Sequence, residues 1–251
     1  MADKFHRFAA LHVPGNPLIL YNAWDVGSAL AVAKAGAKAV ATGSAAVAAA
    51  HGYGDSEDLP LDLVLANAAR IVSAVALPVS IDFEGGYAAD PATVAFNAQR
   101  LVATGAIGCN FEDRIVGEDA LHSIEFQSRR IAAIRKAVGP AFFINARTDI
   151  FLKAVPDEHD AALIDAATER ANAYADAGAS GFFAPGLVDA LLIARLCKHT
   201  GLPVNIMEFP GVPSPKALAD AGVARISYGA SPYRNAMAAL VEAAQMEFSW
   251  R

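Results

Sequence analysis

The sequence has few cysteines and little excess positive charge, and each shortage excludes a class of protein. Its two cysteines, Cys109 and Cys197, make no disulfide framework and match no zinc-ligand spacing, so we expect a reduced, cytoplasmic protein. Twenty Lys and Arg residues stand against 26 Asp and Glu residues, which gives a net charge of −6. Because the longest basic run is Arg129-Arg130, we expect neither a nucleic acid nor an anionic membrane as a partner.

Long apolar runs are also missing, although hydrophobic residues make up 55% of the sequence. Alanine accounts for much of that share, and no stretch of about 18 apolar residues is free of Gly, Pro and charge, so we expect no membrane span. The first residues, Met1–Arg7, lack the apolar segment of a signal peptide. A chain of 251 residues fits one large domain with a sizeable core.

What the sequence does contain is a recurring joint built around glycine. A small-Gly-small triplet follows a stretch of helical periodicity and precedes a short apolar run at Ala35–Ala37, Thr104–Ala106, Ala177–Ala179 and Ala221–Val223. A glycine just past a helix supplies the left-handed residue that ends it, so each joint predicts a helix that leads directly into a strand.

Eight short apolar runs predict eight strands. They are nearly continuous rather than alternating, as expected of parallel strands that are buried on both faces. The predicted strands are Leu18–Tyr21, Ala39–Thr42, Pro78–Ile81, Ile107–Phe111, Phe142–Asn145, Gly181–Ala184, Pro203–Met207 and Arg225–Tyr228.

The alternation of these strands with helices predicts an α/β fold, a single-domain (β/α)8 TIM barrel over residues 1–251, with a doubly wound sheet as the alternative. Capping residues place helix starts at Asp90-Pro91, Ser123 and Ser214-Pro215, and another at Asp157 or His159. A last helix over 232–248 follows the eighth strand. Its apolar positions nearly encircle it, which favours burial against a second subunit.

Carboxylates gather where the third and fourth predicted strands end, at the edge that carries the active site in barrels of this kind. Asp82 and Glu84 are two residues apart and can face the same side, and Glu112 ends the neighbouring strand. Three hard oxygen donors without nearby His or Cys suit Mg²⁺, or Mn²⁺, rather than Zn²⁺. The alternative is a salt-bridged rim in which these acids pair with Arg114 and Arg147.

Other strand ends carry candidate binding groups. Arg147 is suited to hold a substrate carboxylate in two-point geometry, although it could equally pair internally with Asp149 or Glu112. The small-residue turn Thr42–Ala45 presents backbone N–H groups that could bind a carboxylate or a phosphate. Asn205 is more typical of a satisfied core amide than of a ligand, and His122 of a solvated loop.

The positions of the lysines argue against a Schiff-base mechanism. An imine-forming aldolase on this fold needs a lysine inside the barrel, often on the sixth strand. The predicted sixth strand, Gly181–Ala184, has none, and all seven lysines fall in predicted helices or loops. Metal-stabilised enolate chemistry is therefore the better hypothesis.

At these residues the sequence resembles the isocitrate lyase/phosphoenolpyruvate mutase superfamily over nearly its whole length. The most specific match is Ile81-Asp82-Phe83-Glu84-Gly85-Gly86-Tyr87, which is similar to the D-x-D/E-x-G-Y segment of the family. Further matches follow in the right order at Asn110–Asp113, Asn145–Asp149 and Asn205–Phe209.

The resemblance implies a Mg²⁺-dependent barrel that acts on small 2-oxo or 2-hydroxy acids. In such a barrel Asp82 holds the metal directly, and Glu84 and Glu112 help through water. The substrate-binding positions implied are Ser44, Ala45, Asp55, Asp82, Arg147 and Asn205. The family also implies a homo-oligomer, a dimer or a tetramer, in which the last helix is swapped between neighbouring barrels.

One departure from the family changes the expected reaction. The family's C–C lyases carry a K-K-C-G-H segment whose Cys is the catalytic acid/base, and the corresponding segment Arg114–Ser123 has no Cys. Catalytic roles then fall to Arg147 and to a proton donor among His122, Glu118 and Asp119. We expect a Mg²⁺-dependent lyase or decarboxylase that acts on a small 2-oxo or 2-hydroxy acid, mono- or dicarboxylic, through a metal-stabilised enolate. The alternatives are P–C bond chemistry on phosphonopyruvate and non-catalytic binding of 2-oxo acids.

Overall fold

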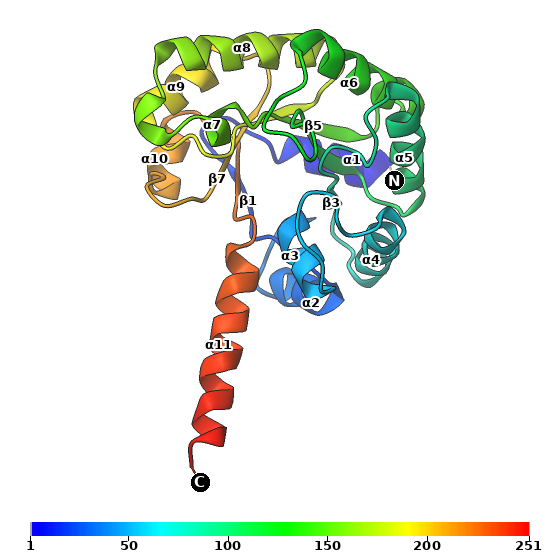
Figure 1. Cartoon of the computed structure of the whole chain (residues 1–251), viewed down its shortest axis with the longest axis vertical. Coiled ribbons are helices and arrows are strands. Elements are labelled where there is room, and N and C mark those ends of the chain that lie inside the picture. The colour runs from blue at the N-terminus through cyan, green and yellow to red at the C-terminus, as the bar shows by residue number, and fades with distance from the viewer. Residues whose placement is uncertain (1, 251) are drawn as a thin grey trace.

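Eight parallel strands form a nearly closed barrel in the computed structural model, which describes residues 2–250 (Figure 1). The strands neighbour one another in the order β1-β8-β7-β6-β5-β4-β3-β2. A parallel bridge between Ala23 and Thr42, just beyond β1 and β2, closes the remaining gap. The predicted (β/α)8 barrel is therefore confirmed. The strands are β1 (Leu18–Leu20), β2 (Val40–Ala41), β3 (Val79–Asp82), β4 (Gly108–Glu112), β5 (Phe143–Arg147), β6 (Gly181–Phe183), β7 (Val204–Met207) and β8 (Arg225–Ser227).

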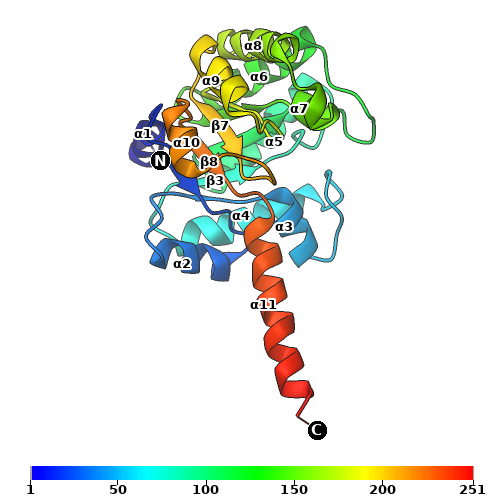
Figure 2. The same cartoon turned by 90° about the vertical axis from the view of Figure 1, so that its left-hand side faces the viewer.

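Helices surround the barrel and connect its strands (Figures 1 and 2). They are α1 (Ala2–Ala10), α2 (Val26–Lys34), α3 (Ser44–Ala50), α4 (Leu61–Ala74), α5 (Pro91–Ala103), α6 (Ile124–Val138), α7 (Ile150–Lys153), the 3₁₀ turn η1 (Pro156–Glu158), α8 (Ala161–Asp176), α9 (Ala190–His199), α10 (Pro215–Asp220) and α11 (Ser231–Phe248). None of the helices within residues 2–250 is both long enough and apolar enough to cross a membrane.

The helix starts follow the capping residues, with one correction. Asp90 and Ser123 accept backbone N–H groups of the first turns of α5 and α6, as predicted. The helix predicted to start at Asp157 or His159 instead starts after Asp160, whose carboxylate accepts the N–H of Leu163 at 2.8 Å. Pro156 opens the separate 3₁₀ turn η1 before it, so the true cap comes later than the sequence suggested.

The N-terminal end of the barrel is filled by apolar side chains. Phe8 of α1 is fully buried in a cluster with residues at the starts of the strands, among them Leu18 and Phe143. Gly108 makes room for this packing, because a Cβ atom there would lie 2.6 Å from the carbonyl oxygen of Phe143. The closed lower end leaves the opposite, C-terminal end of the barrel for binding and chemistry.

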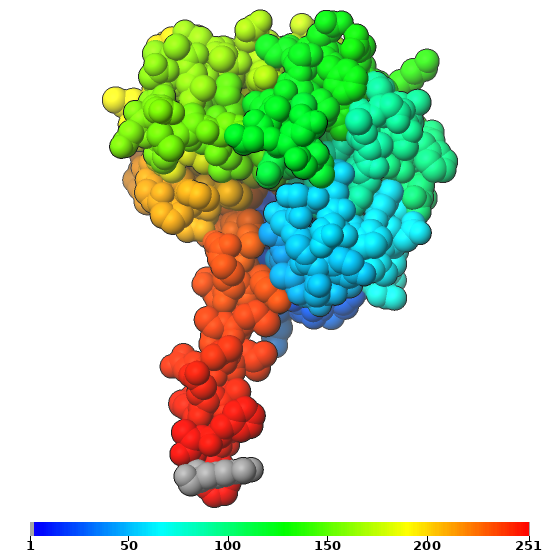
Figure 3. Space-filling model, in the orientation of Figure 1, coloured from blue at the N-terminus to red at the C-terminus, as the bar shows by residue number. Residues whose placement is uncertain are grey.

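Helix α11 projects away from the barrel as an isolated arm (Figures 1 to 3). It matches the helix predicted over 232–248 but begins one residue earlier. Large apolar side chains are exposed on the arm: Leu240 is 61% exposed, Val241 54% and Phe248 80%. The barrel alone thus leaves most of this helix without a packing partner.

Candidate active site at the barrel mouth

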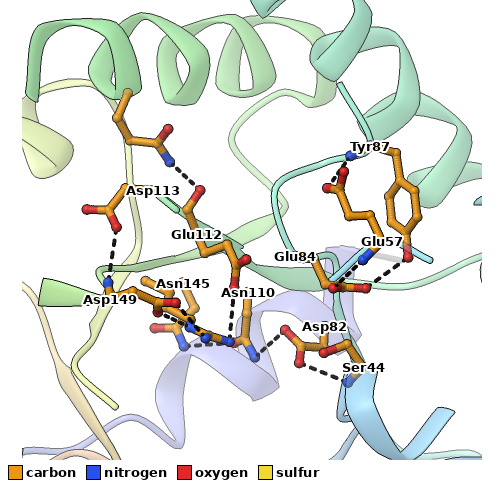
Figure 4. A network of polar contacts seen from close by, with 12 residues as sticks. Ser44, Glu57, Asp82, Glu84, Tyr87, Asn110, Glu112, Asp113, Asn145 and Asp149 are labelled. Carbon is orange, nitrogen blue, oxygen red and sulfur yellow. Dashed lines mark hydrogen bonds and ion pairs between the residues drawn. The ribbon is translucent and has the colours of Figure 1, made fainter. Parts of the chain in front are cut away.

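Asp82 lies at the C-terminal end of β3, where it is held by groups from two neighbouring segments (Figure 4). One carboxylate oxygen, Oδ2, accepts the backbone N–H of Ser44 at 3.0 Å. The other, Oδ1, accepts the side-chain amide of Asn110 at 3.2 Å. Asn110 stands opposite Asp82 in the β3–β4 register, so strand pairing itself sets this contact.

Glu84 lies just beyond β3 in a left-handed backbone conformation, with φ of +49°. Its buried carboxylate accepts the backbone N–H of Glu57 at 2.8 Å and the hydroxyl of Tyr87 at 3.0 Å. Burial, together with the negative charge of Asp82, raises the pKa of Glu84 to about 7. The end of β3 therefore holds two carboxylates that repel each other in a poorly solvated site, which favours a proton or a cation bound there.

Glu112 and Arg147 stand opposite each other at the ends of β4 and β5. Arg147 Nη1 lies 3.0 Å from Glu112 Oε2, and Arg147 Nε lies 2.6 Å from Asp149 Oδ1. Burial raises the pKa of Glu112, and the guanidinium of Arg147 opposes that rise. Although burial alone would lower it, the charges of Glu112 and Asp149 raise the pKa of Arg147. The internal pairing that the sequence left open for Arg147 is therefore present.

A cavity of about 290 Å³ opens at this end of the barrel, and we call it the mouth cavity. It collects five of the six predicted substrate-binding residues, which are Ser44, Ala45, Asp55, Asp82 and Arg147. Two other residues of its lining had no role assigned from the sequence: Glu208, which lies within the matched segment Asn205–Phe209, and Arg234. Ser231 donates to Glu208 at 2.9 Å and accepts from Arg234 at 3.0 Å. The signal available in the sequence was the position of Arg234 in the first turn of the helix after β8.

The remaining predicted residues lie outside that lining. Asn205 is buried within the barrel, where its Oδ1 accepts the hydroxyl of Ser227 at 3.0 Å. Glu118 is exposed in the turn of the loop after β4. His122 is partly buried rather than solvated, and it lines a separate cavity of about 280 Å³, which we call the side cavity. Burial, assisted by Arg130, lowers the pKa of His122 to about 4, so its imidazole is uncharged at neutral pH.

The three predicted metal ligands do not form a ready-made cluster. Within residues 2–250, no three His, Cys, Asp or Glu side chains are placed so that they could hold a metal ion as they stand. Asp82 faces Ser44 and Asn110, Glu84 faces Glu57 and Tyr87, and Glu112 faces Arg147. The donor set nevertheless fits Mg²⁺, because it consists of carboxylates on adjacent strand ends whose mutual repulsion a cation would relieve.

Comparison with known proteins identifies the family. The family model described as phosphoenolpyruvate phosphomutase matches residues 8–247. The chain belongs to the isocitrate lyase/phosphoenolpyruvate mutase superfamily. The 2-methylisocitrate lyase of Escherichia coli K12 is 30% identical over 248 residues, which cover 90% of this chain and 81% of that enzyme. The resemblance of the sequence to this superfamily is thereby confirmed.

Solved structures of the superfamily show the same barrel. A protein of Burkholderia cenocepacia J2315, solved as a candidate phosphonomutase, has a TM-score of 0.93 and 46% identity, covering 97% of this chain and 99% of that one. A phosphonopyruvate hydrolase in complex with oxalate and Mg²⁺ shares the fold with a TM-score of 0.83 and 21% identity, covering 95% of this chain and 84% of that one. The superfamily thus includes lyases, mutases and hydrolases.

Proposed function

We propose that this protein is a Mg²⁺-dependent lyase or decarboxylase that acts on small 2-oxo or 2-hydroxy acids with one or two carboxylates. The observation that carries the proposal is the mouth cavity, which places the Asp82 carboxylate, the backbone of Ser44 and Ala45, and Arg147 around one space. Carboxylates to bind a hard cation and cationic and N–H groups to bind an acid are the two requirements of such a site.

Asp82, Glu84 and Glu112 are the residues that would hold the metal. Bound Mg²⁺ would supply the positive charge that stabilises the enolate left when a C–C bond breaks. The retained carboxylates also favour an enzyme over a protein that binds 2-oxo acids without chemistry. The phosphonopyruvate hydrolase that shares this fold was itself crystallised with oxalate and Mg²⁺.

The chain's own residues would orient the substrate. The N–H groups of Ser44 and Ala45 are donors for one substrate carboxylate, and the Ser44 N–H is at present donated to Asp82. Arg147 keeps its charge through its two carboxylate partners and lines the same cavity. It can therefore balance negative charge that develops during the reaction.

The loop after β4 decides which C–C reaction fits best. Retro-aldol cleavage of isocitrate-type acids needs a base for the 2-hydroxyl and an acid for the departing enolate, and the loop Arg114–Ser123 has no Cys to serve as that acid. Decarboxylation of a β-keto acid needs no base, because the carboxylate is already ionised. We therefore favour oxaloacetate-type acids over isocitrate or methylisocitrate.

P–C bond chemistry is the second candidate. It is favoured by the phosphoenolpyruvate phosphomutase family match and by the 46% identity to the candidate phosphonomutase of Burkholderia cenocepacia. Against it, the loop Arg114–Ser123 is short and has no lysine or asparagine, whereas the family resemblance implies a longer gating loop with both residues in a mutase.

A substrate panel separates these functions. The purified protein would be assayed with oxaloacetate, methylisocitrate, isocitrate and phosphonopyruvate, each with Mg²⁺ and with a chelator. We expect Mg²⁺-dependent turnover of oxaloacetate and little or no turnover of the tricarboxylates. Turnover of phosphonopyruvate alone would favour the second candidate, and tight binding without turnover of any acid would identify a binding protein.

A further inference from the structure

Arg114 occupies a fixed position directly after the site carboxylates. It begins a short hairpin in which Arg114 and Leu121 form an antiparallel bridge. The N–H of Ile115 donates to the carbonyl of Ala120 at 3.0 Å, and the N–H of His122 donates to the carbonyl of Asp113 at 2.8 Å. These bonds hold the backbone of Arg114 in place beside Glu112, so its side chain starts from a defined point at the barrel mouth.

The guanidinium of Arg114 lacks the partners that neighbouring arginines have. Its Nε is buried without a hydrogen-bond partner in the described part of the chain, and none of the ion pairs formed within residues 2–250 involves it. By contrast, Arg147 is paired with two carboxylates, and Arg170 with Asp113. Burial of an unpaired guanidinium nitrogen is unfavourable, and an anion bound beside Arg114 would offset that cost.

Arg114 lies on the wall shared by the mouth cavity and the side cavity. The side cavity, about 280 Å³, is also lined by Arg130, His122 and Glu57. Arg130 is almost fully buried and stacks on Phe111, with its carbon Cζ 4.7 Å from the ring centre. The carboxylate of Glu57 already has a hydrogen-bond partner, since it accepts the backbone N–H of Tyr87 at 2.7 Å. The charged side chains that line the side cavity are therefore two guanidinium groups, those of Arg114 and Arg130, and one carboxylate, that of Glu57.

We propose that Arg114 and the side cavity form a second anion subsite, which receives the distal carboxylate of a dicarboxylic 2-oxo acid. The 2-oxo acid end would remain in the mouth cavity with Ser44, Asp82 and Arg147. A guanidinium fork matches a carboxylate in two-point geometry, and Arg114 is placed to reach it from the shared wall. This assignment rests on the proposed function and narrows its substrate class to dianionic acids.

The test compares a dianion with a monoanion of the same headgroup. Binding of 2-oxoglutarate and of 2-oxobutyrate to the Mg²⁺-loaded protein would be measured by calorimetry for the wild type, Arg114→Gln and Arg114→Lys. Arg129→Gln is the matched control, because Arg129 is exposed on α6 and pairs with Glu125 at 2.8 Å, outside both cavities. We expect Arg114→Gln to weaken 2-oxoglutarate binding by about tenfold or more and 2-oxobutyrate binding by less than about twofold. Arg114→Lys should retain part of the selectivity.

The possible results distinguish failure of the Arg114 subsite from failure of the proposed function. Equal losses for both acids in Arg114→Gln, or no loss for either, would overturn the assignment of Arg114 while leaving the 2-oxo acid site intact. A wild-type protein that binds neither acid would refute the proposed function, and the subsite with it. A selective loss that also appeared in Arg129→Gln would show a general charge effect and would likewise overturn the assignment.

Discussion

Arg147 has two roles, since it neutralises buried carboxylates and lines the mouth cavity. We predict that Arg147→Met weakens oxalate binding at least about tenfold, because the cavity loses its anchored cation. The same change should destabilise the fold by about 3 kcal/mol, because Glu112 and Asp149 lose their buried partner. Calorimetric binding and denaturant unfolding measure the two effects separately. Unchanged oxalate affinity in folded Arg147→Met would contradict the anchoring role.

His12 predicts a specific dependence of stability on pH. Burial, with the charge of Arg225, lowers the pKa of His12 to about 3, against 6.5 when unfolded. Below pH 6.5 His12 binds a proton in the unfolded chain, whereas in the folded chain it stays neutral down to about pH 3. The free energy of unfolding therefore falls as pH falls from 6.5 toward 3. At pH 5 the loss amounts to about 2 kcal/mol.

The variant His12→Gln isolates that contribution. It should flatten the decline in unfolding free energy between pH 7 and pH 5 by about that amount, as measured by urea unfolding at each pH. His6→Gln, which changes an exposed histidine of α1, the helix that ends shortly before His12, should keep the wild-type profile. An unchanged slope in His12→Gln would show that another group causes the acid sensitivity.

Side chains of helix α6 hold the segments that build the site in place. Its Gln127 donates to the carbonyl of Glu112 at 3.0 Å, and its Arg130 donates to the carbonyls of Gly85 and Ala88. We predict that Arg130→Met destabilises the fold by about 3 kcal/mol, because it leaves buried carbonyls unsatisfied. Thermal unfolding would measure this, with Arg129→Met on the exposed face as the control. Equal destabilisation by the two variants would contradict this role of Arg130.

All eight strands were predictable, because a parallel strand buried on both faces leaves a continuous apolar run such as Phe142–Asn145. The acids at the strand ends were also predictable, because the C-terminal ends of the strands carry the active site in barrels of this kind. Their partners were not: the contact of Glu84 with Glu57 depends on left-handed backbone at both residues, which no periodicity encodes. Arg234 joins the mouth cavity only through barrel closure, which places the start of α11 around the same cavity as Ser44, after β2, and Asp82, at the end of β3.

Helix α11 projects from the barrel, and a single copy of the chain provides no packing partner for most of it. We propose that the arm packs against a second copy of the chain, as the superfamily resemblance implied. Sedimentation velocity at micromolar concentration should show a dimer or a tetramer. Leu240→Glu combined with Val241→Glu should dissociate it, because both side chains are exposed on the isolated arm. A wild-type monomer at that concentration would contradict the proposal.

The most direct test of a Mg²⁺-dependent 2-oxo acid enzyme is oxaloacetate turnover as a function of Mg²⁺ concentration, in the wild type and in Asp82→Asn. Asp165→Asn is the control, because Asp165 is an exposed acid of α8 that pairs with Arg195 at 2.7 Å. We expect wild-type turnover to saturate with Mg²⁺ and to vanish with chelator, and Asp82→Asn to lose at least about 100-fold of it. Turnover that persists without metal, or that survives unchanged in Asp82→Asn, would contradict the assignment of this site.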